Sequence, residues 1–102
     1  SIWGEIGASM EVAYSLTKAG IIGFTKALSK EVSLNGVRVN AVSPGAVDTD
    51  MMKEYSTEDV KAFCEEIPLG RLATPEEIAD GVLFLLEQKY ITGQILSITG
   101  GY

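Results

Sequence analysis

Tyr14 and Lys18 are the two side chains best placed for acid–base chemistry, because they stand four residues apart in a segment of helical composition. An α-helix completes a turn in about 3.6 residues, so side chains at this spacing project from one face and address one small volume. A phenol loses its proton too reluctantly at neutral pH to act alone, whereas a neighbouring ammonium favours the phenolate. The pair can exchange a proton with a substrate if it faces a cleft, and is a surface feature if it faces solvent.

Other catalytic residue types are scarce in this sequence. The 102 residues include no histidine and one cysteine, Cys64, which has no basic neighbour to activate its thiol. Ser-His-Asp and Cys-His chemistry and an internal disulfide are excluded within these residues, and no metal site is expected. Proton transfer must therefore use a tyrosine, a lysine, a serine or a carboxylate.

Composition predicts a soluble globular protein. Hydrophobic residues make up 46% of the sequence, its apolar runs are far shorter than a membrane span, and no secretory signal opens it. A single cysteine suits a reducing compartment, so we expect a cytoplasmic protein with no membrane partner. The net charge of −6 and the lack of a basic patch argue against nucleic acid as a partner.

A long helix is predicted over residues 10–35, which carries the Tyr14–Lys18 pair and ends at Asn35-Gly36. Its apolar stripe at helical spacing consists of Ala13, Thr17, Gly20, Ile21, Phe24, Leu28 and Val32.

Two glycines and a second apolar side predict further packing of this helix. Gly20 and Gly23 are unfavourable inside a helix, so we expect another element to approach the backbone there. Ala19 and Ile22 add apolar material behind the stripe. This pattern indicates packing against a sheet and a second helix, from the same chain or from another subunit.

Residues 37–43, among which Val37, Val39 and Val42 are β-branched, predict a strand that stops at Pro44-Gly45. A long helix, a strand and a turn at the carboxyl edge of that strand follow one another in parallel α/β sheets, where ligands bind beyond the strand ends. Residues 44–49 are therefore expected to line the same cleft as Tyr14.

Residues 46–73 read as a long excursion with one short helix, which Ser56 caps and Pro68 terminates near Glu66. Thr74-Pro75-Glu76-Glu77 has the signature of a helix start. This last helix is expected to end near Gln88 and to bury Ile78, Val82, Leu85 and Leu86.

A second strand region is predicted over residues 90–98, interrupted at Gly93. Two parallel strands buried on both faces do not form a stable sheet alone, so further strands are expected beside them. No linker or internal repeat divides the sequence, which we therefore assign to part of one domain.

These segments together resemble the short-chain dehydrogenase/reductase family, in particular its 3-oxoacyl-acyl-carrier-protein reductases and glucose/ribitol-type dehydrogenases. Residues 14–18 match the Tyr-x-x-x-Lys motif, and residues 39–45 match a strand followed by a Pro-Gly turn. Residues 68–71, 74–79 and 91–94 continue the pattern in order. The resemblance implies an α/β fold in which residues 1–102 form the C-terminal half of one NAD(P)-binding Rossmann-like domain. Such a domain is a doubly wound parallel sheet in three α/β/α layers, which is incomplete without its N-terminal half.

The resemblance also implies the roles of individual residues. Ser1 would orient the reacting oxygen, Tyr14 would exchange the proton, and Lys18 would assist it, while hydride passes between the substrate and a nicotinamide. The expected cofactor is NADP, with NAD as the alternative. Its nicotinamide half would lie against Tyr14, Lys18, Pro44, Gly45, Val47 and Thr49, with Thr49 at the carboxamide.

Substrate and assembly stay open at this point. The family's glycine-rich pyrophosphate turn would precede residue 1, so residues 1–102 alone are expected to be inactive. The sequence does not distinguish an acyl thioester, a sugar alcohol and a steroid as the carbonyl or alcohol substrate. A homo-oligomer through the long helix is expected; the rival hypothesis is a non-catalytic, self-associating fragment. The Thr99-Gly100-Gly101 turn departs from the family's frequent Asp-Gly-Gly, with no clear consequence for catalysis.

Overall fold

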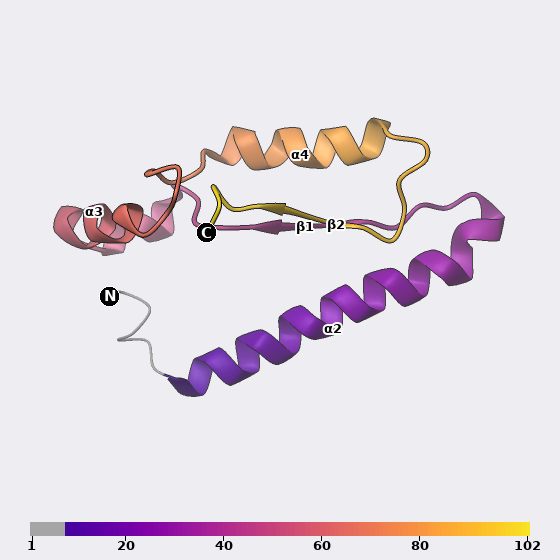
Figure 1. The fold of residues 1–102 in the computed structure, drawn as a ribbon, viewed down its shortest axis with the longest axis horizontal. Helices are drawn as coiled ribbons and strands as arrows, with labels where there is room; N and C mark the ends of the chain where they lie inside the picture. The colour runs from indigo at the N-terminus through magenta and orange to yellow at the C-terminus, as the bar shows by residue number, and fades with distance from the viewer. Residues whose placement is uncertain (1–7) are drawn as a thin grey trace.

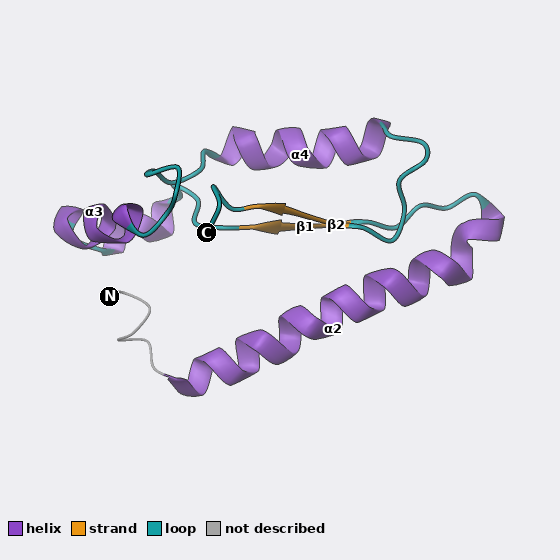
Figure 2. Cartoon of the chain, viewed as in Figure 1, coloured by secondary structure: helices purple, strands orange, loops and turns teal. Residues whose placement is uncertain are grey.

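The computed structural model describes residues 8–102, and the side chains from residue 12 onward. Helix α2 (Ala8–Val32) covers one face of a two-stranded sheet and helix α4 (Pro75–Glu87) covers the other (Figures 1 and 2). Strands β1 (Ala41–Pro44) and β2 (Ile95–Ile98) pair in parallel, with Ala41 opposite Ile95 and Pro44 opposite Ile98. Helix α3 (Thr57–Glu65) lies beyond the carboxyl ends of both strands. The predicted three-layer parallel α/β arrangement is confirmed for these residues.

The long helix has the predicted extent. Helix α2 continues into a 3-10 turn, η1 (Ser33–Asn35), and Gly36 then adopts a left-handed φ of 74° while its N–H donates to the Ser33 carbonyl. A residue with a Cβ adopts this conformation at a cost, which explains why a glycine ends the helix.

Helix α2 is buried along a narrower face than its apolar stripe predicted. Its buried side chains are Thr25 and Ser29, whose hydroxyls donate to the carbonyls of Ile21 and Lys26 within the helix. Ile21 and Phe24 of the predicted stripe are instead 54% and 65% exposed. The expected burial of Ile21 and Phe24 was wrong, because the spacing of apolar residues identifies a face of the helix but not the element that covers it.

Gly20 and Gly23 are not approached by any element of the described chain. A Cβ built on either glycine would meet no atom within 4 Å among residues 8–102. The predicted close packing at these positions is therefore wrong within the part of the chain that the structure describes. Contact with the sheet side occurs further along α2, where the Ser29 Oγ lies 2.7 Å from a Cβ built on Gly93.

Strand β1 is shorter than the predicted strand. The ladder begins at Ala41, and residues 37–40 are held by other contacts instead. The Val39 N–H donates to the Thr92 hydroxyl, and the Val39 carbonyl accepts from the Gly93 N–H. Gly93 has a φ of 71°, so it turns the chain into β2 just where the regular ladder starts.

Arg38 and Asn40 tie the start of β1 to the connection between α4 and β2. The Arg38 guanidinium donates to the carbonyls of Leu85, Leu86 and Ile91 at 2.9, 3.0 and 3.1 Å. The Asn40 side chain donates to the Ile91 carbonyl and accepts from the Gln94 N–H. Arg38 therefore caps the carbonyl end of α4 from another element, a role that the sequence analysis missed.

Helix α4 begins as predicted. The Thr74 hydroxyl accepts from the Glu77 N–H, while the Glu77 carboxylate accepts from the Thr74 N–H, which completes a capping box. Leu85 is buried, but Val82 and Leu86 are 41% and 66% exposed, so the prediction that they are buried was wrong. Gly81 faces the sheet instead, where a Cβ would collide with the Ile98 side chain.

The 46–73 segment has its own small core beside the sheet. It contains η2 (Asp50–Glu54) and α3, and the Ser56 hydroxyl caps α3 as predicted by accepting from the Asp59 N–H. Phe63 and Ile67 are each 4% exposed. They pack with Ala46, Tyr55 and Leu72 of the same segment. A bridge between Val47 and Ala73 closes its base.

Candidate active site

The structure brings Tyr14, Lys18 and Pro44 to one pocket, which we call the α2–sheet pocket. It has a volume of about 230 Å³ and lies between α2 and the sheet, which diverge toward the amino end of the helix (Figure 1). The predicted juxtaposition of the helix pair with the carboxyl edge of β1 is confirmed for these three residues. The pocket is lined by Tyr14, Thr17, Lys18, Ile21, Ile22, Ala41, Val42, Ser43, Pro44 and Ile95.

The pocket combines apolar walls with few polar groups, as ligand sites commonly do. Isoleucine and valine side chains from both α2 and the strands form the walls. Tyr14 lines the pocket while 64% of its surface remains exposed. The Thr17 hydroxyl donates to the Ala13 carbonyl at 2.9 Å, so its proton is directed back into the helix. Among the polar lining side chains, Tyr14, Lys18 and Ser43 therefore remain available for proton exchange with a ligand in this pocket.

Seven of the ten lining residues were not predicted as members of the site: Thr17, Ile21, Ile22, Ala41, Val42, Ser43 and Ile95. Among them, Ser43 adds a fourth polar side chain immediately before Pro44, and Ile22 adds apolar wall one turn beyond Lys18. The spacing of Ile22 from Lys18 is four residues, which is the signal that would have placed it on the same helical face.

Gly45 lies at the strand edge but does not line the pocket. Its N–H donates to the Ile98 carbonyl at 2.8 Å, and a Cβ there would stand 2.9 Å from the Thr99 Cα. Because the close atom belongs to the backbone, it cannot rotate away, so only glycine fits without a shift of the chain. The Pro44-Gly45 turn is thus packed directly against the end of β2.

Val47 and Thr49 lie outside the α2–sheet pocket. Val47 is half-buried where it pairs with Ala73, and Thr49 is exposed at the start of η2, where its carbonyl accepts from the Met52 N–H. The expectation that residues 44–49 share one cleft with Tyr14 therefore holds for Pro44 and not for the residues after it. Ser1 lies outside the described residues.

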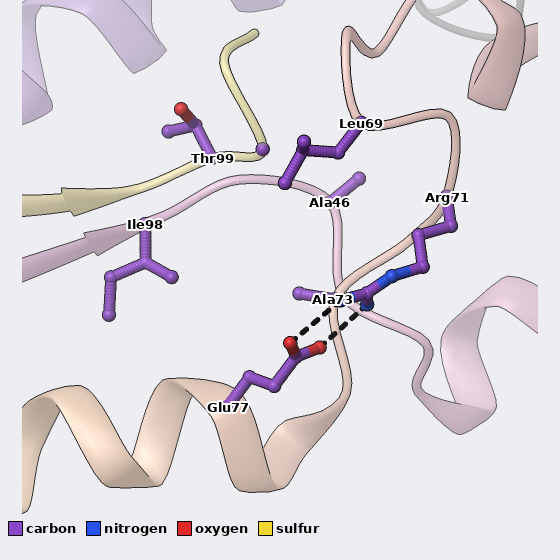
Figure 3. A pocket seen from close by; sticks show the side chains of 8 residues that line it. Ala46, Leu69, Arg71, Ala73, Glu77, Ile98 and Thr99 are labelled. Carbon is purple, nitrogen blue, oxygen red and sulfur yellow. Dashed lines mark hydrogen bonds and ion pairs between the residues drawn. The ribbon is translucent and has the colours of Figure 1, made fainter.

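A second, smaller cavity of about 80 Å³ lies at the base of the 46–73 segment (Figure 3). Arg71 and Glu77 point toward each other at its rim and form two hydrogen bonds of 2.7 and 2.8 Å. With the Thr74 N–H as a further donor, the Arg71 guanidinium lowers the pKa of the Glu77 carboxyl from 4.5 to about 2. The cavity is too small for a substrate, and the ion pair ties the segment to α4.

We expect the Glu77 carboxylate to titrate near pH 2 in the folded protein. Since its pKa is lower in the folded state, the stabilisation from the pair is fully present above the unfolded value and is lost as pH falls through about 2. A carbon-detected NMR titration of the Glu77 carboxyl measures the midpoint directly. In Arg71→Met the midpoint should move toward 4.5, the ordinary value; the same midpoint in both proteins would contradict this explanation.

Residues 8–102 place no group of three histidine, cysteine, aspartate or glutamate side chains where it could hold a metal ion. None of the helices over the same residues is both long and apolar enough to cross a membrane.

Comparison with known proteins identifies the family. A family model described as enoyl-(acyl carrier protein) reductase matches residues 1–102. An uncharacterized oxidoreductase, YmfI of Bacillus subtilis, is 56% identical over 104 aligned residues, which cover 100% of this chain and 43% of that protein. The 3-oxoacyl-[acyl-carrier-protein] reductase FabG of Chlamydia muridarum is 50% identical over 103 residues, covering 99% and 42%. The chain thus spans about two fifths of the length of the relatives it matches.

A solved structure agrees with this sequence relationship. The 3-hydroxyacyl-CoA dehydrogenase type-2 of Mycobacterium avium superposes with a TM-score of 0.83 at 40% identity. The match covers 87% of this chain and 35% of that one. The family model, the sequence relatives and the solved structure therefore agree, and the chain belongs to the short-chain dehydrogenase/reductase family.

Proposed function

We propose that residues 1–102 are the C-terminal half of one NAD(P)-binding domain in an oxidoreductase. Two observations support this: the chain matches about two fifths of its relatives, and large apolar side chains of both α2 and α4 are exposed in it. Additional strands beside β1 and β2 would cover part of this apolar surface. Most of the cofactor would then be held by residues outside this sequence.

The proposed reaction is hydride transfer between NADP(H), with NAD(H) as the alternative, and a carbonyl or alcohol substrate. The observation that carries it is the pocket shared by Tyr14, Lys18 and Pro44, which lies between α2 and the length of β1 up to its carboxyl end. The similarity to FabG, which is named a 3-oxoacyl-[acyl-carrier-protein] reductase, supports reduction of a 3-oxoacyl thioester as the activity. Sugar-alcohol and steroid oxidoreduction are the alternatives within the family.

The residues of the pocket fit a nicotinamide nucleoside. Its apolar walls suit a flat ring, and the Lys18 ammonium and Tyr14 hydroxyl suit the hydroxyl groups of a ribose. Pro44 would line the ring on the strand side, whereas Gly45, Val47 and Thr49 lie outside this pocket and would meet the carboxamide only if it extends past the end of β1. When bound, the cofactor supplies or accepts the hydride.

Tyr14 is the proposed general acid in reduction and general base in oxidation. Its hydroxyl donates a proton to the carbonyl oxygen of the substrate, and Lys18 stabilises the resulting phenolate by its positive charge. Ser1 is proposed to donate a hydrogen bond to the same substrate oxygen and to hold it near Tyr14. These three side chains form the proposed catalytic group.

A cytoplasmic homo-oligomer that assembles through α2 completes the proposal. Val12, Leu16 and Phe24 are 71%, 75% and 65% exposed on this helix, and the open backbone at Gly20 and Gly23 would let a second helix approach closely. Burial of this face in a dimer would remove apolar surface from water.

The activity is tested by assaying the full-length protein with NADPH and with NADH against a 3-oxoacyl thioester, a ketose and a steroid ketone. We expect consumption of NADPH with the thioester and none by residues 1–102 alone. Turnover only with another substrate would replace the substrate assignment. An absence of turnover with every pair, together with self-association of the protein, would support the non-catalytic alternative.

A further inference from the structure

Residues 99–102 form a turn that packs against the proposed nicotinamide side of the site. The Thr99 Cα would stand 2.9 Å from a Cβ on Gly45, and the Gly45 N–H donates to the neighbouring Ile98 carbonyl. The turn is therefore in direct contact with the Pro44-Gly45 edge of β1.

The opposite side of the same turn packs against the 46–73 segment. The Leu69 N–H donates to the Gly100 carbonyl at 3.0 Å. The centroids of the Tyr102 and Phe63 rings are 5.8 Å apart, and the two ring planes are tilted by 52°. Aromatic rings at this separation and tilt attract one another.

Both glycines of the turn are required by these contacts. Gly100 and Gly101 have φ angles of 66° and 93°, in the left-handed region. A Cβ on Gly100 would stand 3.0 Å from the Ile67 Cγ2, and a Cβ on Gly101 would stand 3.0 Å from the Pro68 Cβ. The backbone of the turn thus fits closely against the end of the segment that carries α3.

The 46–73 segment has a core of its own, which the turn contacts from outside at Phe63 and Ile67. Phe63 and Ile67 pack with residues of the segment itself, and its two ends meet at the Val47–Ala73 bridge. The small cavity at this base, lined in part by Ala46, Leu69 and Thr99, leaves space beside the sheet (Figure 3). If the Val47–Ala73 bridge were the only contact that held the segment, α3 could tilt relative to the carboxyl end of β1.

From these contacts we infer that the 99–102 turn is a positioning element that holds α3 in place beyond the strand ends, where the 46–73 segment would form the wall that a substrate longer than the α2–sheet pocket meets. This inference rests on the proposed function for its catalytic consequence. The turn links the edge that would carry the nicotinamide to the segment that a long acyl substrate would meet. Residues 99–102 do not take part in the chemistry.

Hydrogen exchange of the full-length protein tests the positioning role without any assay of activity. In Tyr102→Ala and in Gly101→Ala, amides of α3 should exchange about three- to tenfold faster, the range expected for losing one aromatic pair. Amides of α4 should keep their rates in both variants. Gly36→Ala is the matched control, because it introduces the same left-handed strain at a φ of 74° where a Cβ meets no atom within 4 Å.

Each outcome decides the inference. Unchanged exchange in α3, or equal acceleration in α3 and α4, would overturn it, since the second result reports only global destabilisation. With active protein, Tyr102→Ala should raise KM for a long 3-oxoacyl thioester and leave kcat for a small ketone unchanged; equal KM values would overturn the catalytic consequence. Protein that reduces no carbonyl would refute the proposed function, whereas the exchange rates would still decide whether the turn holds α3.

Discussion

Replacement of Tyr14 by phenylalanine in the full-length protein is expected to lower kcat by about 10²- to 10⁴-fold, the usual contribution of a positioned proton donor. The substitution removes one hydroxyl from the α2–sheet pocket and keeps the ring that forms part of its wall. Cofactor affinity should fall far less than kcat, because Lys18 remains to bind the ribose hydroxyls after the Tyr14 hydroxyl is lost. Stopped assays of NADPH consumption give kcat, and a fluorescence titration gives the dissociation constant for the cofactor.

Tyr90→Phe is the matched control for this experiment. Tyr90 is fully exposed in the connection between α4 and β2, so the same loss of a hydroxyl should leave kcat and cofactor affinity as they are. Full turnover by Tyr14→Phe would remove Tyr14 from its proposed role. Loss of cofactor binding together with turnover would mean that the hydroxyl serves binding and not proton transfer.

Replacement of Arg38 by methionine is expected to destabilise the protein by about 2–3 kcal/mol, because hydrogen bonds from charged donors are each worth about 1.5–3 kcal/mol and water can replace part of them. The guanidinium donates to three carbonyls, those of Leu85, Leu86 and Ile91. Methionine keeps the apolar stem and removes every donor. Equilibrium unfolding in urea measures the loss.

Arg38→Lys separates hydrogen-bond geometry from charge. A lysine keeps the positive charge near the carbonyl end of α4 but cannot reach three carbonyls with a planar fork, so most of the loss should remain. Lys89→Met serves as the control, since Lys89 is an exposed cation in the same connection. A change below about 0.5 kcal/mol in Arg38→Met, the size typical of surface substitutions, would show that the three contacts do not stabilise the fold.

Local features of the sequence predicted the helices with good accuracy. The Thr74–Glu77 capping box and the Ser56 cap formed as expected, because their partners lie within a few residues and need no tertiary contact. Exposure was predicted less well. Phe24 and Leu86 were assigned to buried faces, but no element of the described chain covers them.

Contacts between distant segments escaped prediction for a different reason. Arg38 lies 47 residues from Leu85, and Gly45 meets Thr99 across the ends of two strands. Neither contact leaves a periodic or short-range signal. The 99–102 turn was noted only because Thr99 stands where the family motif often has an aspartate, and the packing of Gly100 and Gly101 against Ile67 and Pro68 became visible in three dimensions.

By itself, the sequence determined the helix ends, the parallel order of the strands and the common face of Tyr14 and Lys18, because backbone periodicity and capping are local properties. Only the tertiary structure decided which strand edge that face meets and which residues line the pocket between them. It also decided that Val47 and Thr49 turn away from this pocket. The physical reason is that side-chain spacing specifies a direction from a helix, whereas the partner in that direction is chosen by the packing of the whole chain.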